Sequence, residues 1–178
     1  MNSRDANSEA ADRFGLIAQR FCSLVDSAIT MGKTEFSVEL YRILPDLIAE
    51  AIRLPEVELH EMDSNQESNT RKLRAKAAMR DDDWRKLYNS LTEKLGDWNL
   101  YWQVFDPTKD DEAIHGSLAD DVADIYRDLK PGIYLKGIDQ ASFRDIIWEW
   151  RFGFHSHWGK HAIDALRIFH FLLAETLE

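Results

Sequence analysis

Apolar residues recur at helical spacing along most of this chain, and this periodicity restricts the fold more than any other feature. They occupy every third or fourth position from Phe14 to Ala28, and the pattern resumes from Phe36 to Leu54. Such spacing places apolar side chains on one face of a helix, whereas a half-buried strand alternates them. We find no alternating run of useful length. The sequence therefore predicts an all-α protein.

Capping and helix-breaking residues divide the first half of the pattern. Ser8 is suited to begin the first helix and Gly32 to end it. Thr34 is expected to open the second helix, which Pro55 ends. Pro45 lies inside this second helix, where it removes a backbone donor and clashes with the preceding turn. We therefore expect a kink or a break just before Pro45.

The second half begins with an amphipathic helix from Trp84 to Leu95. Residues 97–107 hold four aromatic side chains, and we expect them to pack into the core as an irregular connection. Residues 108–116 read as a polar loop. Ser117 is then predicted to cap a helix over residues 118–130, which the Pro-Gly pair that follows interrupts. A final helix is expected to begin at residue 139 or 142 and to run to residue 177.

The length and composition favour one domain. With 178 residues, of which 44% are hydrophobic, the chain can bury one core. We expect residues 1–178 to form a single-domain bundle of five to six helices with a long C-terminal helix, and the polar residues 56–78 to be a mobile connection within it. Cys22 is the only cysteine, and no segment resembles a membrane span or secretory leader. A cytoplasmic protein that does not contact membranes is expected.

The charge is strongly acidic. Thirty-two carboxylates oppose 22 Lys and Arg, which gives a net charge of −10. Binding to nucleic acid requires cations that displace phosphate counterions, so we expect no nucleic-acid partner. Part of the excess is local, because residues 106–128 contain eight acidic and two basic residues. A solvated acidic face is the expected structure of this segment.

Three long strings carry a family resemblance. They are Tyr101–Pro107 (YWQVFDP), Gly116–Leu129 (GSLADDVADIYRDL) and Trp148–Leu166 (WEWRFGFHSHWGKHAIDAL). Together they resemble a bacterial domain-of-unknown-function family, which we identify as the one numbered five thousand and sixty-three. The likeness runs from about Phe14 to the C-terminus. It implies a bacterial helical protein, and it implies no activity and no catalytic residues.

The segment from residue 148 to residue 161 concentrates chemically useful side chains. It holds three of the six tryptophans and three of the six histidines. If residues 143–173 form one helix, steps of about 100° place His157, His161 and Asp164 in the middle of its apolar stripe. The same arithmetic places Asp121 and Asp128 along one edge of the apolar seam of the helix capped by Ser117, with Asp124 farther out. We expect these two helices to face each other.

Such a cluster has three interpretations. His157, His161, Asp164, Asp121 and Asp128 form a hydrogen-bonded network within the core, a site for a divalent metal ion or for acid-base catalysis, or a pocket for a small ligand. Nearby arginine and lysine side chains favour the first interpretation, because they neutralise the aspartates. Neither of these two helices contains the Glu-x-x-His pattern of di-iron bundles. The cofactor, if there is one, is not identified by the sequence.

Trp148, Phe152 and His155 fall on the opposite side of this helix. Exposed, they would form a hot spot for a protein partner, and the alternative is that the first or second helix covers them. We therefore expect an interaction or regulatory module with a protein partner. The alternative function is a metal-dependent hydrolase or related enzyme, with a His/Asp site between the helix capped by Ser117 and the C-terminal helix.

Overall fold

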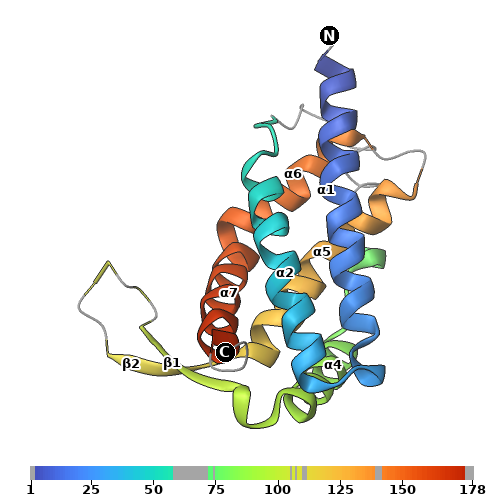
Figure 1. The fold of residues 1–178 in the computed structure, drawn as a ribbon. Helices are drawn as coiled ribbons and strands as arrows, with labels where there is room; N and C mark the ends of the chain where they lie inside the picture. Colours follow the sequence, from blue (N-terminus) through green and yellow to red (C-terminus); the bar gives the residue numbers. More distant parts are fainter. Residues whose placement is uncertain are drawn as a thin grey trace.

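The structure is a computed structural model that describes residues 3–57, 72–73, 75–104, 106, 108–109, 112–138 and 142–174. Within these ranges the chain forms an all-α bundle with a long C-terminal helix and one small two-stranded sheet, as Figure 1 shows. The predicted fold class is confirmed. The elements are α1 (Ser3–Asp26), α2 (Lys33–Ile52), α4 (Asp81–Leu95), β1 (Leu100–Val104), β2 (Ala113–Ser117), α5 (Leu118–Lys136), α6 (Phe143–Gly153), the π-helical turn η3 (Phe154–Trp158) and α7 (Gly159–Ala174).

The first two helices pack against each other along their predicted apolar stripes. Phe14 and Phe21 of α1 and Leu44 of α2 are fully buried. Helix α2 runs from Lys33 to Ile52 without the break that Pro45 could have caused. The predicted connection over residues 56–78 lies largely outside the described residues, although residues 72–73 and 75–77 are helical.

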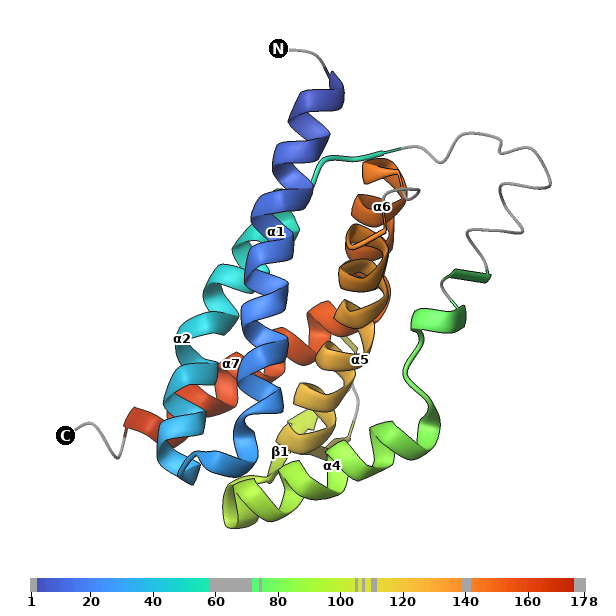
Figure 2. The ribbon, with the colours of Figure 1, turned by 90° about the vertical axis from the view of Figure 1, so that its right-hand side faces the viewer.

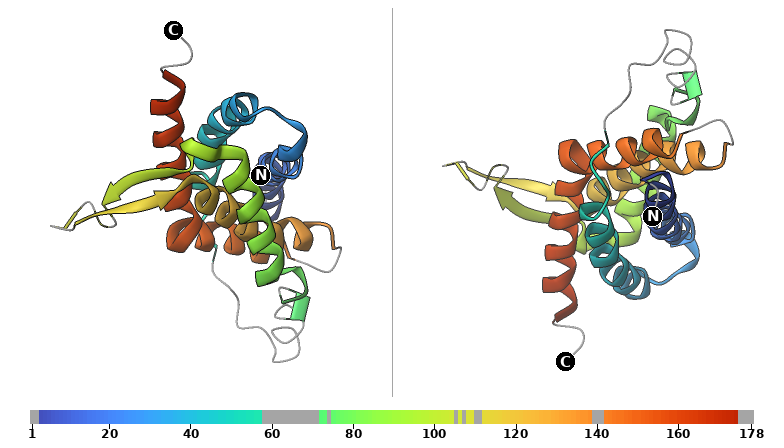
Figure 3. Two further views of the ribbon diagram at one scale, coloured as in Figure 1. Left: turned by 90° about the horizontal axis from the view of Figure 1, so that it is seen from below. Right: turned by 90° about the horizontal axis from the view of Figure 1, so that it is seen from above.

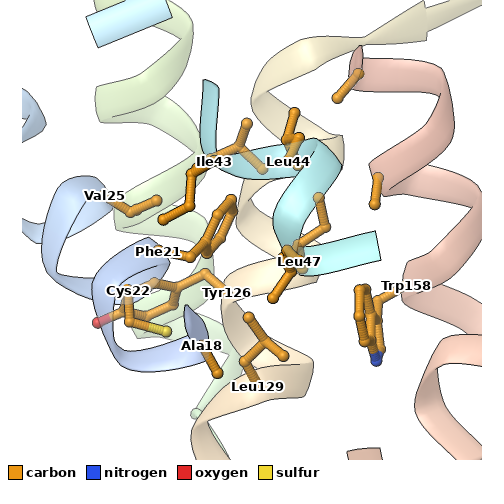
Figure 4. Close-up of a cluster of buried hydrophobic side chains, with 14 of the residues drawn as sticks. Ala18, Phe21, Cys22, Val25, Ile43, Leu44, Leu47, Tyr126, Leu129 and Trp158 are labelled. Carbon is orange, nitrogen blue, oxygen red and sulfur yellow. The ribbon is translucent and has the colours of Figure 1, made fainter. Parts of the chain in front are cut away.

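Helix α5 lies at the centre of the bundle and contacts α1, α4, α6 and α7. Figure 2 shows it between α1 and α4, and Figure 4 shows Leu129 of α5 among buried side chains of α1 and α2. The predicted cap is confirmed, because the Ser117 hydroxyl oxygen accepts a hydrogen bond from the Asp120 backbone N–H at 3.3 Å. A helix covered from so many sides buries consecutive residues, including 121–126. The polar positions of α5, like its apolar seam, therefore contact other helices.

The predicted end of α5 at residue 130 is wrong. The helix continues through Pro131 to Lys136. A proline removes only one backbone hydrogen bond, and tertiary packing holds the last turns. A Cβ atom at Gly132 would overlap the Trp150 indole, whose Nε1 donates a hydrogen bond to the Leu129 carbonyl oxygen at 3.3 Å. Glycine at this position lets α6 pack closely on α5.

The expectation of an irregular, buried connection over residues 97–107 and a polar loop over 108–116 is also wrong. Strands β1 and β2 form an antiparallel hairpin in which Tyr101 pairs with Gly116 and Trp102 with His115. Figure 1 shows the hairpin extending away from the helices. Tyr101 is buried, whereas Leu100 and Trp102 are each 63% exposed. Aromatic residues occupy both faces of β1, so the sequence lacked the polar-apolar alternation that reveals a strand.

The C-terminal helix begins as predicted but is not straight. The Ser142 hydroxyl oxygen accepts a hydrogen bond from the Arg144 backbone N–H at 3.2 Å. The π-helical turn then separates α6 from α7, and Figures 2 and 3 show that these two helices run in different directions. A Cβ atom at Gly159 would overlap the Phe154 carbonyl oxygen, so glycine permits this turn. The predicted end at Leu177 lies outside the described residues.

Candidate functional site

Three aspartates of α5 face the start of α7. Asp121, Asp124 and Asp128 recur at intervals of three and four residues, which places them on one side of the helix. Asp121 is only 4% exposed and Asp124 only 6% exposed. Carboxylates are rarely this buried unless other groups bind them, so each has partners to be identified.

Two histidines supply those partners. His157 Nδ1 lies 2.7 Å from Asp128 Oδ2, and His161 Nδ1 lies 2.8 Å from Asp121 Oδ1. An ionised carboxylate only accepts hydrogen bonds, so Nδ1 of each ring carries the hydrogen. The predicted approach of the two helices is confirmed by these contacts. The metal-binding role of the residues remains a prediction.

The other nitrogen of each ring points toward a single oxygen atom. His157 Nε2 lies 3.5 Å and His161 Nε2 lies 3.6 Å from Asp124 Oδ2. The opposite oxygen of this carboxylate, Oδ1, accepts a hydrogen bond from Trp84 Nε1 at 2.8 Å and forms an ion pair with the Arg127 guanidinium at 2.9 Å. Trp84 and Arg127 therefore orient Asp124 so that Oδ2 faces both imidazoles.

Asp124 was predicted to lie outside this cluster, and it lies at its centre. The prediction measured positions from the apolar seam of α5, but α4 covers a further side of this helix and contributes Trp84. Among the described residues, possible metal ligands come together in two groups, Asp124-His157-His161 and Asp120-Asp121-His161. Asp164 is half-buried and belongs to neither group. The π-helical turn changes the phase between His157 and Asp164, so the spacing along a straight helix that joined these two residues does not apply.

A tyrosine from the hairpin completes the surroundings of Asp121. The Tyr101 hydroxyl donates a hydrogen bond to Asp121 Oδ2 at 2.7 Å. A Cβ atom at Gly116 would overlap the Tyr101 ring, so glycine in β2 gives the ring room to cross the strand. The Asn99 side-chain oxygen accepts a hydrogen bond from the Ala119 backbone N–H at 2.8 Å, which fixes the base of the hairpin to the first turn of α5. Sequence reasoning missed Tyr101; the only signal was the Gly116 that pairs with it.

Burial and charge shift the pKa values of these groups. Burial raises the pKa of Asp121, although hydrogen bonds from His161 and Tyr101 oppose the effect. Burial alone would lower the pKa of His161, but the hydrogen bond and charge of Asp121, with the charges of Asp124 and Asp120, outweigh it and raise the pKa. Burial also raises the pKa of Asp120. The pKa of His161 is therefore raised chiefly by Asp121, and the hydrogen bond with His161 in turn limits the rise in the pKa of Asp121.

A groove of about 920 Å³ lies beside this cluster, between the hairpin and α7. Its apolar lining includes Trp102, Val104, Phe154 and Ile163, and its charged lining comprises Lys160, Asp164 and Arg167. Burial raises the pKa of Asp164 against the opposing charges of Arg167 and Lys160. The groove therefore combines apolar walls with both signs of charge.

The residues predicted to form an interaction surface are divided between two places. Trp148 is partly buried and stacks on Phe152, with ring centroids 4.8 Å apart and planes 5° apart. Phe152 is 56% exposed. His155 is exposed and borders the groove, which the other two residues do not line. Their role in binding remains a prediction.

Comparison with known proteins agrees with the fold. The model of the family described as "Domain of unknown function (DUF5063)" matches residues 5–175. The chain is similar to the crystal structure of protein BF1032 from Bacteroides fragilis, with a TM-score of 0.72 and 22% identity over 90% of this chain and 89% of that chain. At this identity the likeness concerns the fold alone. No curated protein matches. None of the described helices is both long and apolar enough to cross a membrane.

Proposed function

We propose that this chain, which belongs to the DUF5063 family of unknown function, is a protein-interaction module. The proposed contact surface is the hairpin together with its groove against α7. The observation that carries the proposal is the exposed apolar face of β1, where Leu100 and Trp102 are each 63% exposed. Large exposed apolar groups gathered in one place are typical of binding surfaces.

The shape of the hairpin supports this proposal. A two-stranded sheet is at best marginally stable without further packing, and this one extends from the bundle (Figure 3). Tyr101 and Asn99 tie its base to α5, so the strands are held in place for a partner. Tryptophan is among the residues that contribute most to binding energy at interfaces. Trp102 is therefore the proposed anchor.

The groove indicates the chemistry of the partner. Val104, Phe154 and Ile163 offer apolar contacts, while Lys160 and Arg167 bring positive charge to a chain that is otherwise acidic. We propose that the partner contributes a segment with apolar side chains and at least one carboxylate. His155 borders the same groove, and the stacked Trp148 and Phe152 form a second, smaller candidate surface.

The alternative of a metal-dependent hydrolase finds no support in either comparison. The groove and the histidine cluster are also lined by different residues. The interaction role is the function that we carry forward.

Site-specific photo-crosslinking in the native host cells tests the proposal. A photoreactive phenylalanine analogue is placed at Trp102, at Phe152 or at Ile29, which is 79% exposed and distant in sequence from the groove. We expect a discrete crosslinked species from position 102 that Ile163→Asp abolishes. If position 102 gives the same pattern as position 29, the hairpin is not the contact surface. If only position 152 crosslinks, the Trp148 and Phe152 surface replaces it.

A further inference from the structure

We propose that His157, His161 and Asp124 bind one divalent transition-metal ion of the zinc class, through Nε2 of each histidine and Oδ2 of the aspartate. This site is distinct from the groove and does not depend on the interaction role. The inference rests on the orientation of the rings, on the spacing of the three atoms and on the local charge.

The orientation of both rings leaves the nitrogen needed for a metal available. Asp128 accepts the hydrogen of His157 Nδ1, and Asp121 accepts that of His161 Nδ1. With Nδ1 protonated, Nε2 of a neutral imidazole carries a lone pair. Histidines that bind metals almost always donate their other ring hydrogen to a carboxylate, carbonyl or water in this way. Two such pairs, aimed at one point, go beyond what a structural hydrogen-bond network requires.

The spacing fits ligands around a metal better than hydrogen bonds. The two distances from Nε2 to Asp124 Oδ2, 3.5 and 3.6 Å, exceed those of ordinary hydrogen bonds, which cluster near 2.9 Å. Tetrahedral ligands with bonds of about 2.0–2.1 Å to zinc lie about 3.4 Å from one another. All three ligand atoms lie within 4.8 Å of one another. An ion therefore fits between them with only small movements of the side chains.

The local charge also calls for a divalent cation. The three aspartates carry three negative charges when ionised, and the Arg127 guanidinium, 2.9 Å from Asp124, returns one positive charge. With neutral imidazoles these groups keep a net charge of −2, and the neighbouring Asp120 adds further negative charge, so a divalent cation is favoured here. Buried charge that is not neutralised is strongly unfavourable.

The ligand types select the metal. Two imidazoles and one carboxylate suit Zn²⁺ and its neighbours Co²⁺, Ni²⁺ and Fe²⁺, whereas Mg²⁺ and Ca²⁺ prefer oxygen ligands alone. The His157 side chain is 40% exposed, so the remaining coordination position faces solvent and would hold water. The ion would link α5 to the π-helical turn and to the first turn of α7.

Zinc binding to the full chain, prepared without a histidine tag and stripped with chelator, tests the proposal. Calorimetry and elemental analysis are expected to give one zinc ion per chain. We expect Asp124→Asn and His161→Asn to weaken binding by at least about 100-fold, and Asp128→Asn, which alters only the support of His157, by about 10- to 100-fold. His155→Ala is the matched control, because His155 is exposed and lies outside the cluster. This variant should bind zinc as the wild type does.

Wild-type protein that binds no stoichiometric zinc would overturn the proposal, as would undiminished binding in Asp124→Asn. Because a variant of a buried residue can fail to fold, a second measurement uses the wild type alone. Nitrogen-15 spectra of the imidazoles are expected to show zinc shifting Nε2 of His157 and His161 while Nε2 of His155 is unchanged. Shifts at other histidines only would equally overturn it.

Discussion

Replacing Tyr101 by phenylalanine removes a single hydroxyl group and tests whether the hairpin supports the cluster. This hydroxyl donates to Asp121 Oδ2 at 2.7 Å, and the carboxylate is only 4% exposed. Hydrogen bonds to charged groups contribute about 1.5–3 kcal/mol, and water cannot easily replace this one. We therefore expect Tyr101→Phe to lower the free energy of unfolding by about 2 kcal/mol at neutral pH.

Urea denaturation followed by circular dichroism measures this loss. The control is Tyr134→Phe, because the Tyr134 hydroxyl lacks a hydrogen-bond partner among the described residues; its effect should stay within about 0.5 kcal/mol. The Tyr101 hydrogen bond lowers the pKa of Asp121 and therefore stabilises the ionised carboxylate. The loss of unfolding free energy in Tyr101→Phe should be greatest while Asp121 is ionised and should become smaller at lower pH, where Asp121 is protonated. Equal stabilities for the two variants at neutral pH would refute the reasoning.

Three further predictions concern other parts of the chain. Gly159→Ala should force a Cβ atom against Phe154, which should lower the melting temperature by several degrees and change the near-ultraviolet circular dichroism. Gly32→Ala is the control, because the new atom meets open space, and it should change neither the melting temperature nor the spectrum. Burial raises the pKa of the Cys22 thiol to about 12, so the thiol should react with thiol reagents at pH 8 only after unfolding, and rapid labelling of native protein would contradict this. The free energy of unfolding should also fall by about 1.4 kcal/mol per pH unit as the pH rises from about 9 toward the pKa of the buried thiol. Trp102→Ala should change the free energy of unfolding by less than about 0.5 kcal/mol, because the ring is exposed, and a larger loss in urea denaturation would show that Trp102 is structural.

Local patterns predicted much of the fold and part of the site. The sequence predicted that Ser117 caps α5, and the hydroxyl of Ser117 does so. This start point fixed the positions of Asp121 and Asp128 around the helix. The spacing of His157 and His161 by four residues placed both imidazoles on one side of the final helix. These inferences succeeded because capping and helical spacing depend on residues close together in sequence.

The errors came from interactions between distant residues. The π-helical turn altered the direction of the last helix, and it depends on packing around Gly159 that no periodicity records. The contact between Trp84 and Asp124 joins residues 40 positions apart. The hairpin brings Tyr101 to Asp121 only because β1 pairs with β2. Spacing along a single helix cannot predict any of these three features.

The central claim is that Asp121 and Asp128 orient two imidazoles so that their Nε2 atoms meet Asp124 at a metal ion. A crystal structure of the zinc-soaked protein, with diffraction data collected on both sides of the zinc absorption edge, tests it most directly. We predict one anomalous peak about 2.0–2.2 Å from His157 Nε2, His161 Nε2 and Asp124 Oδ2. No peak at this position, or zinc bound only at other residues, would contradict the claim.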